Sequence, residues 1–333
     1  MKSLSMPSRI ASLVVASSVA ALGCSSGPES SAVQSSSAVS SAAPAASKAR
    51  AAHPDYVLTP NGVFAHQDCV HGISPGDVVD LAGNIQKKDG TVQVVAACAQ
   101  PEIAARPRAE TAQKASPAFQ PAADNGWTEA AIWNAPGAVG QYESEFHVPA
   151  APSNYDGQLI YIFPGLQGGG AILQAVIQYG SNGAWGGQYW SMNTWAGGGG
   201  EYNGNYYFGN PVSVNTGDEI HNNEQGFPNN CNGNGCMWEV LGVDGQTGAA
   251  SQYDTYINIS WTQVLGLVIE VYGVDTCADY PATYDNGYNF WITGWSWSGA
   301  GPTWTPGPWT YWNFVSTCGE SITSNDNLVN LYY

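Results

Sequence analysis

The sequence predicts an all-β protein, namely a jelly-roll-like sandwich of two antiparallel sheets preceded by a small disulfide-closed β module. The chain has 40 glycines, 18 tyrosines and 13 tryptophans, while only 11% of its residues are charged. Aromatic and β-branched residues favour strands, whereas helices are built from Leu, Lys and Glu. From residue 126 onward, short β-prone runs alternate with turns such as Asn215-Thr216-Gly217-Asp218, and no segment has a helical period. This spacing is typical of a sandwich.

Two strand-like stretches carry the polar residues of greatest interest. Alternate side chains of a strand point to opposite faces. In residues 171–179 one face carries Leu173, Ala175, Ile177 and Tyr179, and the other carries Ile172, Gln174, Val176 and Gln178. In residues 265–272 one face carries Leu265, Leu267, Ile269 and Val271, and the other carries Val268, Glu270 and Tyr272. We predict that the aliphatic faces are core, and that Gln174 and Glu270 converge in a cleft if the strands are neighbours.

One carboxylate and one amide are sufficient to hydrolyse a peptide bond. Glu270 as general base would take a proton from an attacking water, and Gln174 would hold that water and stabilise the developing oxyanion. The carboxyl would then return the proton to the leaving amine. Such a pair is also consistent with two polar residues that merely face solvent, and the spacing alone does not separate these interpretations.

Short motifs around both stretches resemble those of a known peptidase family. Ala171-Ile172-Leu173-Gln174 and Leu267-Val268-Ile269-Glu270 resemble the two active-site strands of the eqolisin glutamic peptidases, over about Gly126 to Tyr280. Supporting motifs in the same order are Trp127, Phe146-His147-Val148-Pro149, Gly217-Asp218-Glu219-Ile220 and Thr247-Gly248. The resemblance implies a two-sheet sandwich with an acid-active endopeptidase cleft, in which Gln174 and Glu270 are catalytic. We expect no metal or cofactor, a peptide or protein substrate contacted by Trp190 and Trp195, and a monomer.

The charge distribution narrows the possible partners. The net charge is −17, all nine lysines and arginines precede Ala115, and only acidic residues and two histidines carry charge after Gly126. Nucleic acid is an improbable partner because binding it requires cations that replace counterions on phosphates. Carboxylates without cationic partners repel one another at neutral pH, and protonation removes that repulsion. We interpret this as adaptation to acid, although ordinary solubility of an exported acidic protein gives the same pattern.

The segments before Gly126 predict an exported protein. Residues 1–23 combine Lys2 and Arg9 with a short apolar run, as in a signal peptide. The following Cys24 resembles a bacterial lipidation site, with plain secretion as the alternative and a lipid anchor as the only expected membrane contact. Residues 24–52 are a Ser/Ala-rich tether, 53–101 a small module, 102–125 a linker and 126–333 the sandwich domain. The module could be an adaptor, an inert spacer or an inhibitory propeptide, the last released when carboxylates protonate and charge contacts weaken.

The remaining six cysteines agree with export. Proximity in the sequence suggests the pairs Cys69 with Cys98, Cys231 with Cys236, and Cys277 with Cys318. The histidines, among them His147 and His221, show no zinc-ligand spacing.

Two other functions remain open at this point. The aromatic tail, in which Trp295 and Trp297 share one strand face, could form a carbohydrate-binding platform on a non-catalytic sandwich. The chain could also be an inactive interaction module of the cell envelope.

Overall fold

The computed structural model describes residues 51–105, 124–198, 201–232, 235–282, 285–296, 301–313 and 318–333. All of them belong to one compact unit, Ala42–Tyr333. The predicted signal peptide, Cys24, nearly all of the tether, most of the linker and Trp297 lie outside the described residues, so the predictions about them stay predictions. The described part of the chain contains no helix long and apolar enough to cross a membrane.

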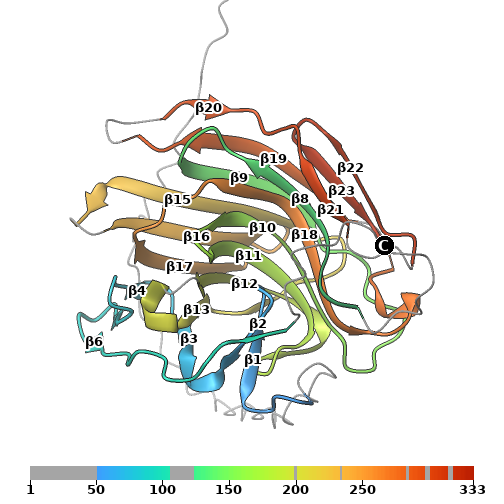
Figure 1. Cartoon of the computed structure of the whole chain (residues 1–333), viewed down its shortest axis with the longest axis horizontal. Helices are drawn as coiled ribbons and strands as arrows, with labels where there is room; N and C mark the ends of the chain where they lie inside the picture. Colours follow the sequence, from blue (N-terminus) through green and yellow to red (C-terminus); the bar gives the residue numbers. More distant parts are fainter. Residues whose placement is uncertain are drawn as a thin grey trace, which may run out of the picture. The chain divides into compact units, whose positions relative to one another are not determined.

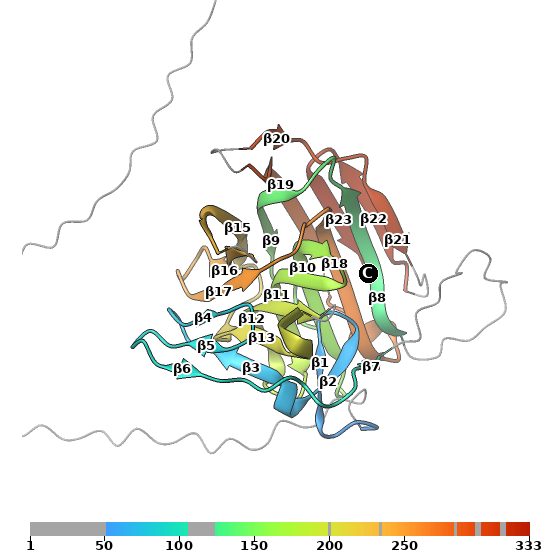
Figure 2. The ribbon, with the colours of Figure 1, turned by 60° about the vertical axis from the view of Figure 1, so that its left-hand side comes forward.

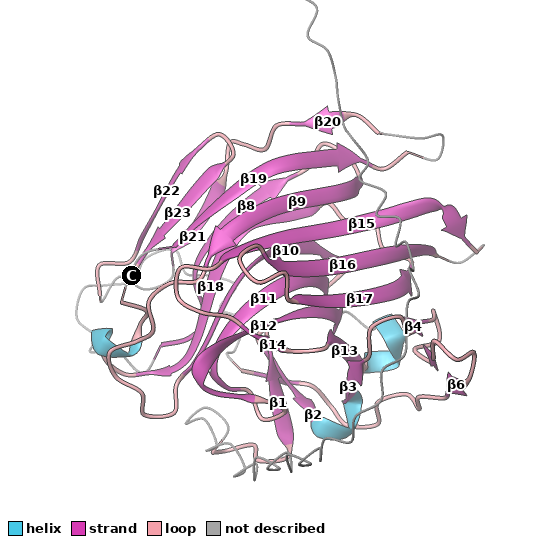
Figure 3. Ribbon diagram, turned by 180° about the vertical axis from the view of Figure 1, so that it is seen from behind, coloured by secondary structure: helices cyan, strands magenta, loops and turns pink. Residues whose placement is uncertain are grey.

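The described residues form two large sheets and a small one, which confirms the all-β sandwich (Figures 1 and 3). The first sheet has the order β21 (Thr310–Asn313), β8 (Asp124–Asn134), β18 (Gln263–Val274), β10 (Leu159–Gly168), β11 (Ala171–Ser181), β12 (Gly186–Gly198), β13 (Tyr206–Gly209) and β3 (Val70–Ile73), with β14 (Val212–Ser213) beside β12. The second sheet has the order β22 (Ser321–Asn325), β23 (Leu328–Tyr332), β19 (Asp285–Gly294), β9 (Val139–His147), β15 (Glu219–Cys231), β16 (Cys236–Asp244), β17 (Ala250–Ile257), β4 (Val78–Val79), β5 (Ile85–Gln86) and β6 (Val92–Gln93), with β20 (Thr303–Trp304) beside β19.

A third sheet consists of β1 (Tyr56–Thr59), β2 (Val63–His66) and β7 (Ile103–Ala104). Short 3-10 helices occur at η2 (Gln67–Cys69), η3 (Glu201–Gly204) and η4 (Cys277–Asp279).

The residues before the predicted linker are integrated into the sandwich. Strand β3 extends the first sheet by pairing with β13, and β4 extends the second by pairing with β17. Both of these pairings are parallel, whereas the strands from residue 124 onward pair antiparallel. We call residues 53–105 the N-terminal module below.

The main core lies between the two large sheets. Leu173 and Ile177 of β11 belong to the same buried cluster as Phe146 and Val240 of the second sheet. This confirms the predicted core face of β11. Strands of the second sheet bury only one face, as the alternating burial of β9 shows. Removing that apolar surface from water provides the main stabilisation.

One residue of the predicted core face lies on the wrong side. Gly266 forms a bulge between Leu265 and Leu267 in the pairing with β8, so Leu265 turns to the opposite face from Leu267. Leu265 packs with Val268 in a second buried cluster. A bulge inserts one extra residue and reverses the side-chain alternation beyond it.

The predicted cysteine pairs are confirmed. Disulfides join Cys69 to Cys98, Cys231 to Cys236, and Cys277 to Cys318. The first closes the N-terminal module, and the third ties the end of β18 to the C-terminal segment.

Candidate active site

Glu270 lies on the face of the first sheet that is turned away from the second sheet. Its neighbours in the pairing are Tyr161 on β10 and Trp127 on β8. The side chain is completely buried. The Tyr272 hydroxyl donates a hydrogen bond to Oε1, whereas Oε2 has no hydrogen-bond partner among the described residues.

Burial raises the pKa of Glu270 to about 8. Hydrogen bonds from Tyr272, from the side chain of Trp127 and from the backbone of Gly62 oppose that rise. In this arrangement the carboxyl is protonated at acidic and neutral pH, and a protonated carboxyl cannot act as a base.

Strand β11 places two glutamines on the same face as Glu270, as its alternation predicts. Gln174 pairs with Gly165 on β10, and Gln178 pairs with Tyr161. Both are completely buried. Neither amide atom of Gln174 has a hydrogen-bond partner among the described residues, and Oε1 of Gln178 has none either. Sequence reasoning placed Gln178 on this face without assigning it a role.

The two predicted substrate-contacting tryptophans lie on opposite faces of β12. Trp195 pairs with Gln174 and belongs to the same buried cluster as Tyr161. Trp190 packs against Tyr179, with ring centroids 5.3 Å apart, in the core between the sheets. The five-residue separation is odd, so strand alternation puts Trp190 on the face opposite the one that carries Glu270.

The face that carries Gln174 and Glu270 is covered by the N-terminal module. Leu58 and Phe64 of the module pack with Val176, Trp195 and Tyr161 in the second buried cluster. Figure 2 shows the blue strands β1 and β2 beside the strands of the first sheet. The face on which the cleft was predicted is therefore covered. Strand β10 is buried on both faces of the sheet, as the continuous apolar run Leu159–Phe163 could have indicated.

Main-chain groups of the module contact the sheet as a bound peptide would. The Tyr161 hydroxyl donates to the carbonyl oxygen of Leu58 at 2.5 Å, and the Leu58 N–H donates to the carbonyl of Asn182 at 3.0 Å. A Cβ placed on Gly62 would lie 3.8 Å from Glu270 Oε1. The turn between β1 and β2 thus reaches the carboxyl itself.

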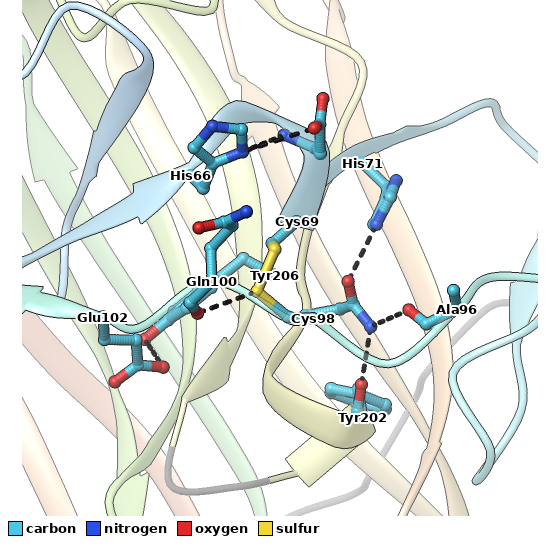
Figure 4. Close-up of a disulfide and its surroundings, with 11 residues drawn as sticks. His66, Cys69, His71, Ala96, Cys98, Gln100, Glu102, Tyr202 and Tyr206 are labelled. Atoms are coloured by element: carbon cyan, nitrogen blue, oxygen red, sulfur yellow. Dashed lines mark hydrogen bonds and ion pairs between the residues drawn. A yellow bond between two sulfur atoms is a disulfide. The ribbon is translucent and has the colours of Figure 1, made fainter.

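Apolar contacts and hydrogen bonds, rather than ion pairs, attach the module. Lys87 pairs with Asp77 of the module itself at 3.0 Å, and within the described residues no module cation pairs with a carboxylate of the sandwich. Figure 4 shows the anchoring near Cys69–Cys98, where the Tyr206 hydroxyl donates to Glu102 at 2.9 Å. The expected charge contacts are therefore absent from the part of the interface that the structure describes.

A cluster of possible metal ligands lies elsewhere, on the solvent face of the second sheet. Potential ligand atoms of Glu145, Glu219 and His221 lie within 4.8 Å of one another. The two shorter contacts are His221 to Glu219 at 3.1 Å and His221 to Glu145 at 3.7 Å. Sequence spacing missed this group because the three residues meet only through the pairing of β9 with β15.

The predicted aromatic platform is only partly described. Trp295 stacks on Trp238 with ring centroids 5.6 Å apart, and both line a pocket of about 520 Å³ beside the Cys231–Cys236 disulfide. This pocket is not lined by Glu270 or Gln174.

Comparison with solved structures finds distant similarity to peptidases. Two crystal structures of scytalido-glutamic peptidase, one with a peptide-based transition-state analogue and one with a transition-state analogue inhibitor, are 12% identical, each with a TM-score of 0.42. A structure of SCP-B, a member of the eqolisin family of peptidases, in complex with the tripeptide Ala-Ile-His, is also 12% identical, with a TM-score of 0.40. Each similarity covers 64% of this chain and 100% of the other chain. No protein-family model matches this chain, and no curated protein matches it.

Proposed function

We propose that the chain is an exported, latent endopeptidase that is active in acid, with Glu270 as general base and a glutamine of β11 as its amide partner. One observation carries the proposal: a buried carboxyl and buried amides share a sheet face on which an extended main-chain segment is bound through its peptide groups. A face that holds a peptide backbone beside a carboxyl and amides has the groups that peptide hydrolysis requires.

The polar atoms of this face support a binding role over a purely structural one. Gln174, Gln178, Asn193 and Glu270 each keep at least one buried polar atom without a partner among the described residues. Each such atom costs about 1–3 kcal/mol when it is buried. A face built only for packing would be more stable with apolar side chains at these positions.

The N-terminal module accounts for latency. By excluding water it raises the pKa of Glu270 to about 8, so the covered carboxyl keeps its proton. When the module leaves, solvation favours the charged form and lowers the pKa. The carboxylate that results can accept a proton from water in mild acid.

The sequence offers a direct way to uncover the site. Trypsin cleaves after Lys and Arg, and every such residue precedes Ala115, so trypsin can attack the module and linker but not the sandwich domain. The trypsin-treated full chain, once trypsin is inhibited, is assayed on a denatured protein substrate from pH 2 to pH 8. We expect the rate of cleavage to be highest at acidic pH. Glu270→Gln should reduce this activity at least about 100-fold, because an amide cannot take the proton.

The matched control is inhibited trypsin without the chain, and the untreated full chain at neutral pH should be inactive. Full activity of Glu270→Gln would exclude Glu270 as the base. No cleavage by the treated chain at any pH would exclude the peptidase function and direct attention to ligand binding at the Trp238 and Trp295 pocket.

A further inference from the structure

Four ionisable side chains form a square on the solvent face of the second sheet. Strands β9 and β15 lie side by side there, with Glu145 opposite His221 and His147 opposite Glu219 (Figure 1). Alternation places Glu145 and His147 on the outer face, because Phe146 between them is buried in the core. The exposed fractions of the four side chains lie between 30% and 45%, so ions from the solvent can reach them.

Three of these residues present ligand atoms close enough to share one metal ion. One atom from each of Glu145, Glu219 and His221 lies within 4.8 Å of the other two. His221 Nε2 is 3.1 Å from Glu219 Oε1. Donor atoms about 2.1 Å from a tetrahedral zinc ion lie about 3.4 Å apart. Movements of about 1 Å by these partly exposed side chains therefore close the set around such an ion.

Two neighbouring residues keep this set of ligands oriented and accessible. His147 Nε2 lies 3.6 Å from Glu219 Oε2, so it orients the carboxylate whose other oxygen faces His221. The Gly245 N–H donates to the main-chain oxygen of Glu219 at 2.8 Å, which holds this glycine beside the cluster. A Cβ placed on Gly245 would lie 2.8 Å from His221 Nε2. Glycine therefore leaves open a nitrogen that any other residue would crowd.

The charges around the cluster favour a bound cation at neutral pH. No lysine or arginine follows Lys114 in the sequence. Among the described residues, the ion-pair partners of Glu145 and Glu219 are histidines. A neutral imidazole leaves two neighbouring carboxylates uncompensated, and their repulsion costs free energy. A divalent cation removes that repulsion and also binds the neutral nitrogen.

Space beside His221 is available for further ligands of a metal ion. A hollow of about 250 Å³ lies next to this side chain, and its lining includes Glu143, Asn223, Leu241 and Val243. One water molecule takes up about 30 Å³ in the liquid, so the hollow has room for several. Three protein ligands with one open position are typical of zinc sites that bind an exchangeable molecule.

We propose that Glu145, Glu219 and His221 bind a divalent transition-metal ion such as zinc, with His147 as a positioning residue for Glu219. An imidazole with two carboxylates favours zinc over calcium and magnesium, which prefer sites made of oxygen atoms alone. The ion links β9 to β15 in the middle of the second sheet. This inference is independent of the proposed peptidase function, because Glu270 lies on the outer face of the other sheet and the core separates the two faces.

Isothermal titration calorimetry of the full chain with zinc chloride at neutral pH tests the site, after treatment with EDTA and its removal. We expect His221→Ala to weaken the binding of one zinc ion at least about 100-fold, because even residues that only support a ligand contribute about 10–100-fold. Glu145→Gln should have the same effect. His147→Ala removes only the support of Glu219 and should weaken binding about 10-fold.

The matched control is His66→Ala, which should leave zinc binding unchanged. His66 faces a single carboxylate, that of Asp68 at 3.5 Å, in the N-terminal module. Circular dichroism establishes that each variant is folded. Glu270→Gln should bind zinc as the wild-type protein does, which separates this site from the proposed catalytic one.

A second measurement is urea denaturation with and without zinc chloride. Zinc should raise the denaturation midpoint of the wild-type protein but not that of His221→Ala, because a ligand that binds only the folded state stabilises it. Equal zinc binding by the wild-type protein and His221→Ala would overturn the proposal, as would a wild-type protein that binds no zinc. Tighter binding of calcium chloride than of zinc chloride would also overturn it, since that preference indicates a site made of oxygen atoms alone.

Discussion

The glycines at the two ends of β11 are constrained for different physical reasons. Gly169 and Gly170 join β10 to β11 with φ of +59° and +85°, as the two central residues of a type I′ hairpin turn require. A Cβ on Gly169 would meet open space, whereas a Cβ on Gly180 would lie 2.1 Å from the carbonyl oxygen of Gln158. Gly180 also has a φ of +96° and supplies the carbonyl that holds Gln178.

We predict that Gly180→Ala destabilises the protein far more than Gly169→Ala. Gly169→Ala should cost about 1 kcal/mol, because only the left-handed backbone conformation is penalised. Gly180→Ala adds a clash with the backbone, which cannot move like a flexible side chain, and should cost about 3 kcal/mol or more. Urea denaturation of the full chain measures both, and equal losses would contradict the close approach at Gly180.

At the scale of elements, the N-terminal module depends on the sandwich and on one disulfide. Its strands β4, β5, β6 and β7 have only two residues each. Strands this short do not form a stable sheet alone. The Cys69–Cys98 bond closes a loop with a sequence separation of 29, and such a bond stabilises by about 3–4 kcal/mol through the entropy of the unfolded chain.

Removing this disulfide should loosen the cover without damaging the site. We predict that Cys69→Ser with Cys98→Ser makes trypsin cut after Lys87 and Lys88 at least ten times faster, and shortens the delay before substrate cleavage begins. The matched control is Cys231→Ser with Cys236→Ser, whose separation is only five residues and which lies in the second sheet. Equal delays in both double variants would show that the module is not held by its disulfide.

At the scale of the whole molecule, buried carboxyls dominate the dependence on pH. Burial raises the pKa of Glu224 and Asp285 well above their usual values. Burial, together with the charge of Glu320, raises the pKa of Glu129 to about 9. Other carboxyls shift the opposite way, since hydrogen bonds around Asp244 lower its pKa although burial opposes them.

These shifts predict a protein that is most stable in mild acid. A carboxyl with a raised pKa contributes stability that is complete below its unfolded pKa near 4, and this stability is lost as pH rises toward the folded value. Each such group costs about 1.4 kcal/mol per pH unit within that window. The groups with lowered pKa values lose their contribution only below about pH 4. We therefore expect the free energy of unfolding to fall steadily from about pH 4.5 to pH 8.

Urea denaturation of the full chain between pH 3 and pH 8 measures this dependence. Glu224→Gln should flatten the curve, because an amide is neutral at every pH. Stability that rises toward pH 8 would contradict the prediction. The interpretation of the acidic composition as adaptation to acid would then fail as well.

Several features of the fold could be read from the chain because they are local. Alternation in residues 171–179 placed Gln174 and Gln178 on one face, and the turn glycines set the hairpin that puts Gln178 opposite Tyr161. The cysteine pairs were also predictable, because each disulfide joins two cysteines that follow each other in the order of cysteines along the chain. Alternation failed at Leu265, where the Gly266 bulge depends on pairing with a distant strand.

The sequence by itself determined the strand composition, most of the sheet faces and the presence of a carboxyl and amides on the faces opposite the core. Only the tertiary structure decided that Glu270 pairs with Tyr161 of β10, because register between strands distant in sequence depends on packing of the whole sheet. The tertiary structure likewise decided that the N-terminal module covers Glu270. Residues 53–105 fold onto a surface formed by strands that are distant in the sequence, and the burial that sets the pKa of Glu270 exists only once both are assembled.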